Sequence, residues 1–213
     1  MRRSRLIAAA CAALAGAGCV SLLPESEPDT LYRLAGVDLD ETVSAAAPVT
    51  VIIDRIAAPR GLAGDRIALL RGDAIAYMAG AAWISPAPQL VESAVLDAFY
   101  ETAPLITPAR AEDGVSARYE LDVELRHFEA EYDRGEGAAP LVRAALRARL
   151  IDRDTRSLAA ARTVERTARA AQNRQSAIVA AFSSAAGDAA RELAGWTEEA
   201  ICRGEAPPEA CGA

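Results

Sequence analysis

The stretch "ARYELDVELR", residues 117–126, decides the fold because apolar and charged side chains alternate along it without interruption. The apolar set is Tyr119, Leu121, Val123 and Leu125, and the charged set is Arg118, Glu120, Asp122, Glu124 and Arg126. A period of two places each set on its own face of an extended strand. The stretch therefore predicts a strand with one buried and one solvated face, as antiparallel sheets commonly have.

A second stretch with the same period follows the connection "EYDRGEGAAP". Its alternating residues are Val142, Ala144, Leu146, Ala148 and Leu150 on one face and Arg143, Arg147 and Arg149 on the other. We predict that the two strands form a hairpin whose acidic and basic outer faces lie side by side, with cross-strand pairs that contribute roughly 0.2–1 kcal/mol each. The arginines could instead form an anion site, but paired charges that fix the register are the favoured interpretation.

Other stretches predict the remaining elements. "PVTVIIDRIAAP" (48–59) indicates a strand that ends at Pro59, and "RIALL" and "AIAYM" indicate a hairpin around the turn at 71–73. Apolar residues at helical spacing predict one amphipathic helix from Pro88 to just before Pro104, and another from about Ser176 to Trp196. "SLAAARTVERTAR" (157–169) is a candidate for a further strand.

The N-terminus has the layout of a secretory signal. A stretch with three arginines precedes an apolar run, residues 6–15, and small residues then lead to Cys19. The run is much shorter than the roughly 20 residues that span a bilayer. Small residues before a cysteine resemble the bacterial lipobox, so we expect removal of residues 1–18, acylation of Cys19 and a flexible leader at 19–29. An ordinary signal peptide with an incidental cysteine is the alternative.

The last two cysteines, Cys202 and Cys211, lie in the C-terminal tail, residues 201–213. Loss of Cys11 with the signal and acylation of Cys19 would leave them as an even pair in an oxidising compartment. We expect a disulfide that clips the tail and contributes about 2–3 kcal/mol. A redox-active pair or a zinc site is the less favoured interpretation, because the spacing and the number of ligands do not suit either.

Length and charge limit the classes of function. Removal of 18 residues from 213 leaves 195, enough for one domain with a sizeable core, which we place at 30–200. The chain has 23 basic and 30 acidic residues, and three of the basic ones lie in the signal, so the mature net charge is 20 − 30 = −10. A body this acidic is a poor binder of nucleic acid or of anionic membranes.

No motif for catalysis is recognisable. The sequence shows neither a catalytic carboxylate pair, nor a glycine-rich phosphate loop, nor a nucleophile elbow. His127, the only histidine, lies where the strand alternation changes phase before Phe128. We interpret it as a structural polar contact or a β-bulge. We therefore expect no catalytic residue, metal site or cofactor.

Four segments carry a family resemblance: "PDTLYRL" (28–34), "VIIDRIAAPRGLAGDRIALLRGDAIAYMAGAAWISP" (51–86), "YELDVELRHFEAE" (119–131) and the late helix that ends at Trp196. In this order they resemble the ABC-type transport auxiliary lipoprotein family, which includes paraquat-inducible protein C. The resemblance implies a single α+β domain in which two main amphipathic helices pack on a curved antiparallel sheet.

The resemblance also implies a location and a partner. The lipid anchor would hold the protein in the outer membrane, facing the periplasm, and Val20 replaces the Asp that usually retains lipoproteins in the inner membrane. The partner would be a mammalian-cell-entry (MCE) protein and, through it, an inner-membrane ABC transporter that moves lipids; a homo-oligomer is left open. The alternatives are a lipoprotein that itself binds a small hydrophobic ligand and a secreted hydrolase of unfamiliar type.

The segment "RGLAGD", residues 60–65, is the candidate docking surface for that partner. Two glycines free its backbone beside a strand, and loops of this kind often carry binding functions. The candidate residues are Arg60, Gly61, Leu62, Gly64 and Asp65. Leu62 is expected to be exposed and to contribute to docking rather than to folding. A merely flexible connection is the equally weighted alternative.

Overall fold

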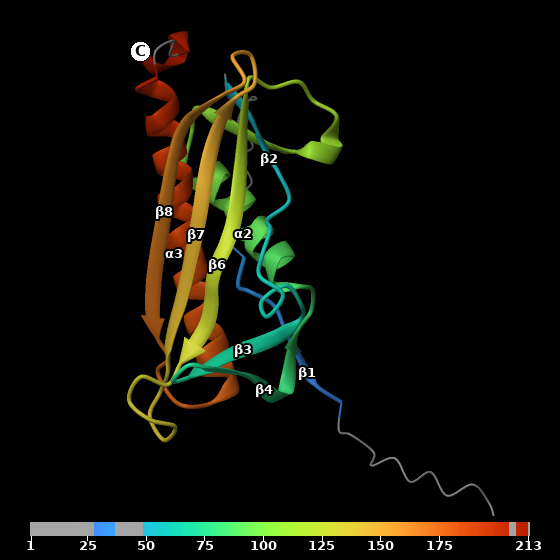
Figure 1. Ribbon diagram of the computed structural model, residues 1–213, viewed down its shortest axis with the longest axis vertical. Helices are drawn as coiled ribbons and strands as arrows, with labels where there is room; N and C mark the ends of the chain where they lie inside the picture. The colour runs from blue at the N-terminus through green and yellow to red at the C-terminus, as the bar shows by residue number, and fades with distance from the viewer. Residues whose placement is uncertain (1–27, 37–48, 205–207, 213) are drawn as a thin grey trace, which may run out of the picture.

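The computed structural model describes residues 28–36, 49–204 and 208–212. Within them, one eight-stranded sheet and two long helices make up the architecture (Figure 1). The strands are β1 (Thr30–Tyr32), β2 (Val49–Ile53), β3 (Arg66–Arg71), β4 (Ala74–Trp83), β5 (Ile106–Arg110), β6 (Tyr119–Glu131), β7 (Leu141–Asp152) and β8 (Ser157–Arg169). The helices are α2 (Ala87–Thr102) and α3 (Gln175–Cys202), with short 3₁₀ turns η1 (Ala111–Asp113) and η2 (Glu209–Gly212).

The long strands β6, β7 and β8 pair in antiparallel order along their whole length. The apolar set of β6 faces the core, where Leu121, Val123 and Leu125 are fully buried. On the outer face Arg149 forms an ion pair with Asp122 of β6, and Arg143 Nε lies 2.8 Å from Glu165 Oε1 of β8. The predicted hairpin and the further strand at 157–169 are confirmed. The predicted charge pairing across the hairpin is confirmed for Arg149, whereas Arg143 pairs with a carboxylate of β8.

The other edge of β6 makes the sheet mixed. β2 pairs in parallel with the start of β6, and β3 pairs in parallel with its end. β5 adds to β2 and β1 adds to β4, both again in parallel. Parallel partners need long connections, so their pairing leaves no local signal in the sequence, whereas strands joined by tight turns are antiparallel. The α+β class with two main helices is confirmed, and the antiparallel order expected throughout holds for the hairpins.

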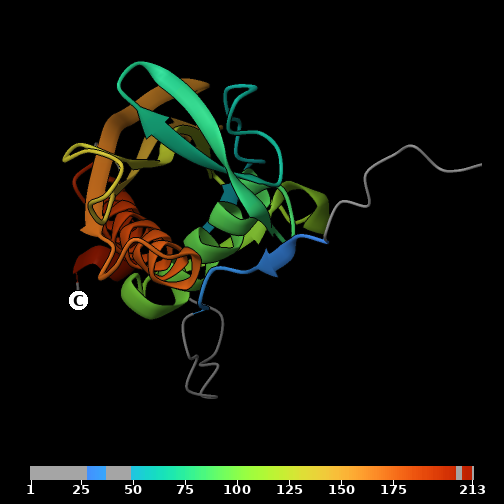
Figure 2. The same cartoon turned by 90° about the horizontal axis from the view of Figure 1, so that it is seen from below.

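The two helices fill the concave side of the sheet. Figure 2 shows the strands along an arc, with α2 and α3 across its open side. Fully buried alanines at positions 185, 189, 190 and 194 let α3 approach the strands closely, because their side chains occupy so little space. The rings of Trp83, Phe128 and Phe182 supply bulk beside them and meet at centroid distances between 4.7 and 5.7 Å. This aromatic cluster joins β4, β6 and α3.

The connection from β2 to β3 is a fixed turn. The carbonyl oxygen of Gly64 accepts the N–H of Ala87 at 2.9 Å, and that of Asp65 accepts the N–H of Trp83 at 2.6 Å. Leu62 is only 7% exposed and belongs to the main core. The expectation of an exposed Leu62 is therefore wrong. Glycines and charges mark the segment as a turn, but they do not reveal that its one branched apolar side chain points inward.

An ion pair ties the start of β6 to the end of β7. Arg118 donates from Nε and Nη2 to Asp152 Oδ2, at 3.0 and 2.7 Å, and Asp152 Oδ1 accepts the backbone N–H groups of Asp154 and Thr155. The bonds from Arg118 and then from Thr155 hold the pKa of Asp152 below its ordinary value of 3.8. Asp152 thus fastens both the β6–β7 ladder and the β7–β8 turn.

The burial of Leu62 predicts a large effect on stability. Leu62→Asp should lower the free energy of unfolding by at least roughly 3 kcal/mol, because it removes buried apolar atoms and buries a charge. Urea denaturation followed by circular dichroism measures the loss. Ala63→Asp, at the exposed neighbouring position, is the matched control and should leave the midpoint almost unchanged. Equal midpoints for the two variants would show that Leu62 is not part of the core.

The lowered pKa of Asp152 predicts a dependence of stability on pH. Since the folded-state pKa lies below the unfolded value, the carboxylate stabilises the fold fully above that value and loses this contribution as the pH falls through the folded-state pKa. Asp152→Asn should therefore lower Tm at neutral pH and reduce the further fall of Tm on acidification from about pH 6 to about pH 2. Asp73→Asn, in the exposed β3–β4 turn, should keep the wild-type dependence. A parallel fall in Asp152→Asn would contradict the assignment.

Candidate functional site

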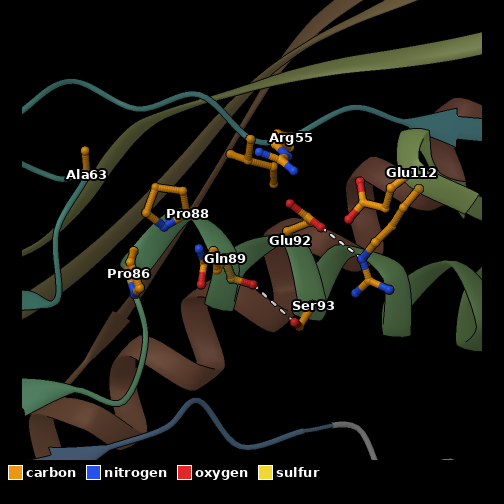
Figure 3. Close-up of a pocket in the computed structure, with 10 residues that line it drawn as sticks. Arg55, Ala63, Pro86, Pro88, Gln89, Glu92, Ser93 and Glu112 are labelled. Carbon is orange, nitrogen blue, oxygen red and sulfur yellow. Dashed lines mark hydrogen bonds and ion pairs between the residues drawn. The ribbon is translucent and has the colours of Figure 1, made fainter.

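A cleft of about 560 Å³ lies beside the N-terminal end of α2 (Figure 3). We call it the α2 cleft. Its lining residues are Arg55, Ile56, Ala63, Pro86, Pro88, Gln89, Glu92, Ser93, Arg110 and Glu112. Four separate parts of the chain supply them: the segment after β2, the 60–65 turn, the start of α2, and the end of β5 with η1. The pairing of β2 with β5 brings the first and last parts together.

One end of the α2 cleft is apolar. Figure 3 shows Ala63, Pro86 and Pro88 grouped at this end. Pro86 precedes the first helical residue and Pro88 lies in the first turn, where a missing N–H costs nothing because it would have no partner within the helix. The hydrogen bond from Ala87 to Gly64 fixes the 60–65 turn against the start of the helix. The wall is therefore preformed.

The other end of the cleft carries charges of both signs. Arg110 Nε lies 3.0 Å from Glu92 Oε1, the pair marked by a dashed line in Figure 3. The backbone N–H of Arg110 also donates to Asp113 Oδ2 at 2.7 Å, which holds η1 in place. Burial raises the pKa of Asp97, one turn further along α2, and the positive charge of Arg110 opposes that rise. Arg110 thus anchors this end of the cleft.

The α2 cleft combines an apolar end with a polar end. Its one hydroxyl nucleophile, on Ser93, donates to the Gln89 carbonyl oxygen at 3.1 Å, a backbone contact within the helix. The prolines offer a rigid apolar surface, while Glu92 and Arg110 offer a hydrogen-bond acceptor and donors at the opposite end. A segment with an apolar side chain followed by polar groups would match both ends.

None of the five residues predicted for docking is among the lining residues of this cleft. Arg60, Gly64 and Asp65 are exposed, and the carbonyl oxygen of Gly61 accepts the Tyr77 hydroxyl at 3.1 Å. The turn reaches the cleft through Ala63, which lies between the predicted residues. The structure therefore brings the segment to a concave surface, with Leu62 withdrawn into the core.

Sequence reasoning missed the opposite wall of the cleft. Glu92 lies within a predicted helix, Arg55 follows β2, and Arg110 is the last residue of β5, which pairs in parallel with β2. No local pattern joins positions 55, 92 and 110. Their meeting depends on the pairing of β2 with β5 and on the packing of α2 against β5, which only the folded chain reveals.

The cysteines fall into two groups. Cys202 and Cys211 are joined by a disulfide, with their Cα atoms 5.4 Å apart, so the clip of the tail onto the end of α3 is present. Cys19, the predicted site of acylation, lies outside the described residues, as do the predicted signal and most of the predicted leader. Its modification stays a prediction.

His127 has the structural role that its position indicates. The register between β6 and β7 shifts between Leu125 and His127, which is a β-bulge. His127 Nδ1 lies 2.7 Å from Glu129 Oε1, and Glu129 Oε2 accepts the N–H of Phe128 at 2.7 Å. The bulge and the polar contact are both confirmed. Glu129 is only 5% exposed, so these hydrogen bonds satisfy a buried carboxylate.

A second cleft, of about 580 Å³, lies near the C-terminal end of α3. Tyr119, Leu150 and Ile201 form a buried apolar floor, and Arg118 and Arg203 stand among its polar lining residues. Arg203 Nη2 lies 2.6 Å from Glu199 Oε2 on the same helix, and Arg118 is paired with Asp152. Both cations therefore have carboxylate partners.

Among residues 28–36, 49–204 and 208–212, no group of three or more histidine, cysteine, aspartate or glutamate side chains could hold a metal ion. In the same part of the chain, no helix is both long and apolar enough to cross a membrane.

Comparisons with known proteins agree with this architecture. A protein from Xanthomonas campestris has a solved structure that superposes with a TM-score of 0.66 at 24% identity, covering 80% of this chain and 96% of that one. A second solved structure, of an uncharacterized protein, gives a TM-score of 0.62 at 15% identity, covering 79% of this chain and 97% of that one. These likenesses show a shared fold.

Sequence comparison supplies the family. A curated but uncharacterized protein of Bradyrhizobium diazoefficiens is 33% identical over 119 residues, which are 56% of this chain and 31% of that relative, so the chain spans about a third of its length. Residues 32–194 match the model of the ABC-type transport auxiliary lipoprotein component family. That match covers β2 to β8, the whole lining of the α2 cleft and most of α3. The chain therefore belongs to the ABC-type transport auxiliary lipoprotein component family.

Proposed function

We propose that this protein is an outer-membrane-anchored periplasmic lipoprotein that serves an ABC/MCE lipid transport system as a non-catalytic accessory. The observation that carries the proposal is the family match over residues 32–194, whose description combines a lipoprotein with ABC-type transport. The outer membrane, the lipid cargo and the MCE partner go further than that description. They are supported by the resemblance of the sequence and by Val20 after Cys19.

The fold suits attachment through the N-terminus. The described chain begins just before β1, which pairs with β4, and the hydroxyl of Tyr32 donates to Gln175 Oε1 of α3 at 3.4 Å. Ala35 N–H donates to Ser183 Oγ of α3 at 3.0 Å. A tether that precedes Thr30 would therefore be connected both to the sheet and to α3, the longest helix. Two or more acyl chains on Cys19 would make that attachment stable.

The α2 cleft is the docking site that we assign to the MCE partner. It joins the 60–65 turn to a preformed wall of prolines and to the Glu92–Arg110 pair. Rigid concave surfaces cost little conformational entropy on binding, because the side chains that line them are already held. The partner would contribute an extended segment with an apolar residue at the proline end.

The second cleft favours one alternative function, the binding of a small hydrophobic ligand by the lipoprotein itself. Its floor of Tyr119, Leu150 and Ile201 is buried and apolar, as ligand sites commonly are. Native mass spectrometry distinguishes the two functions. Lipid retained by the purified protein without a partner would support the alternative, and lipid found only in the complex would support an accessory role.

The anchor predicts the outcome of a substitution at Cys19. Cys19→Ser should abolish acylation and membrane attachment while leaving Tm unchanged, because the site precedes the folded domain. Mass spectrometry of the mature N-terminus and membrane fractionation measure the two effects. Val20→Ser is the matched control and should keep both the lipid and the outer-membrane location. A mature chain that begins elsewhere with an unmodified Cys19 would contradict the lipoprotein anchor.

The docking site predicts the effect of filling the α2 cleft. Ala63→Arg should lower retention of the MCE-domain protein in co-purification by about ten-fold or more, because a long charged side chain would block the proline end. Ala171→Arg, at an exposed position between β8 and α3, is the matched control and should retain the partner. Thermal unfolding should be unchanged in both. Equal retention by the two variants would remove the α2 cleft from the interface.

A further inference from the structure

Two exposed apolar side chains lie next to each other at the edge of the sheet. Leu31 of β1 is 62% exposed, and Ile84, directly after β4, is 59% exposed. β1 pairs in parallel with β4, with Leu31 beside Ala82, and the N–H of Ile84 donates to the Tyr32 carbonyl oxygen at 2.8 Å. Ile84 thus follows β4 two residues beyond the partner of Leu31, and its backbone is hydrogen-bonded to the residue after Leu31. We call the two side chains the Leu31–Ile84 patch.

Strand alternation turns this patch away from the core. Tyr32 faces α3, where its hydroxyl donates to Gln175, and Trp83 is buried against Phe182. Neighbouring residues of a strand point to opposite faces, so Leu31 and Ile84 face outward. Outward positions of β6 and β7 carry charged side chains instead, such as those of the Asp122–Arg149 pair. The patch is therefore an apolar exception on the outer surface.

The position of the patch along the chain points to its occupant. Leu31 lies 12 residues after Cys19, and an extended chain of that length reaches at most roughly 40 Å. β1 lies toward the lower end of the molecule in Figure 1, whereas the C-terminus lies at the upper end. α3 has 28 residues, and a helix of that length spans roughly 42 Å between the two ends. The leader is therefore long enough for this end to reach the leaflet that holds the acyl chains, and this end is the one nearer to Cys19 along the chain.

The chemistry of the patch agrees with a lipid surface. Asp29 and Arg33 flank Leu31 and carry opposite charges, so the patch has no net charge with which to attract an ionic partner. Aliphatic side chains beside an anchor can enter the boundary between headgroups and acyl chains whatever the lipid charge. The acidic body, which disfavours electrostatic attachment to anionic lipid, makes an apolar contact the suitable mode.

We propose that the Leu31–Ile84 patch rests on the phospholipid leaflet that holds the anchor, with both side chains inserted at the level of the headgroups. The proposal rests on the acylation of Cys19 that the proposed function includes. Insertion fixes the orientation of the body, with β1 and β4 against the membrane and the C-terminal end of α3 directed away from it.

Dye-labelled cysteine variants of the acylated full-length protein in phosphatidylcholine vesicles test the proposal. The variants are Leu31→Cys and Ile84→Cys, with Leu158→Cys at the start of β8 as the control, because Leu158 is 60% exposed. The Cys202–Cys211 disulfide and the acylation of Cys19 keep the native cysteines out of the labelling reaction. A quencher attached to the lipid acyl chains reports contact with the leaflet.

We expect the dyes at 31 and 84 to lose fluorescence to the quencher and the dye at 158 to keep it, at low and at high salt alike. Vesicle flotation shows in parallel that all three variants are attached, and thermal unfolding shows that they are folded. Attached protein with no quenching at 31 and 84, or with equal quenching at all three sites, would overturn the patch. If the dyes at 31 and 84 become protected from solvent only when the MCE protein is added, the patch contacts that partner and not the membrane. Failure of flotation would instead overturn the acyl anchor, together with the proposal that depends on it.

Discussion

Strand β6 carries the constraint on which the rest of the structure depends, because one of its edges belongs to β7 and the other is divided between β2 and β3. β2 pairs with its first residues, Ala57 bridges to Glu124 further along, and β3 joins near Ala130. The bulge at His127 falls between these contacts, where extra twist redirects the strand from one partner to the other. The hydrogen bonds to Glu129 therefore stabilise the point at which the sheet changes neighbours.

Much of the fold could be predicted from the sequence because its signals are local. Strict alternation indicated β6 and β7, helical spacing placed α2 and the start of α3 closely, and the change of phase at His127 marked the bulge, whereas α3 continues beyond the predicted end at Trp196 to Cys202. The parallel pairings could not be predicted in this way, since each joins strands far apart in the chain. Leu62 was misjudged for a related reason: whether a side chain in a turn points inward depends on a core assembled from distant segments.

At the candidate site, too, only the features with local sequence signals could be predicted. The 60–65 turn could be recognised from its glycines, but its hydrogen bonds to Trp83 and Ala87 and its position beside the Glu92–Arg110 pair come from tertiary structure. The arginines of β7 were an alternative candidate site in the sequence, but Arg143 and Arg149 pair with carboxylates on the neighbouring strands. Charges paired in this way fix the register of the strands. Recognition by this protein would then depend on shape and apolar contact more than on its many charges.

The short strand β1 also has a mechanical consequence. The backbone hydrogen bonds between β1 and β4 run across the strand direction, and the hydrogen bonds from Tyr32 and Ala35 to α3 lie nearby in the chain. A pull that reaches the domain along the strand axis loads these bonds in shear, all at once, whereas a pull across the strand would peel them open one by one. Three paired residues can then bear a force that the same three would not withstand in peeling. The bonds from Tyr32 and Ala35 pass the load into α3, whose other end carries the Cys202–Cys211 disulfide.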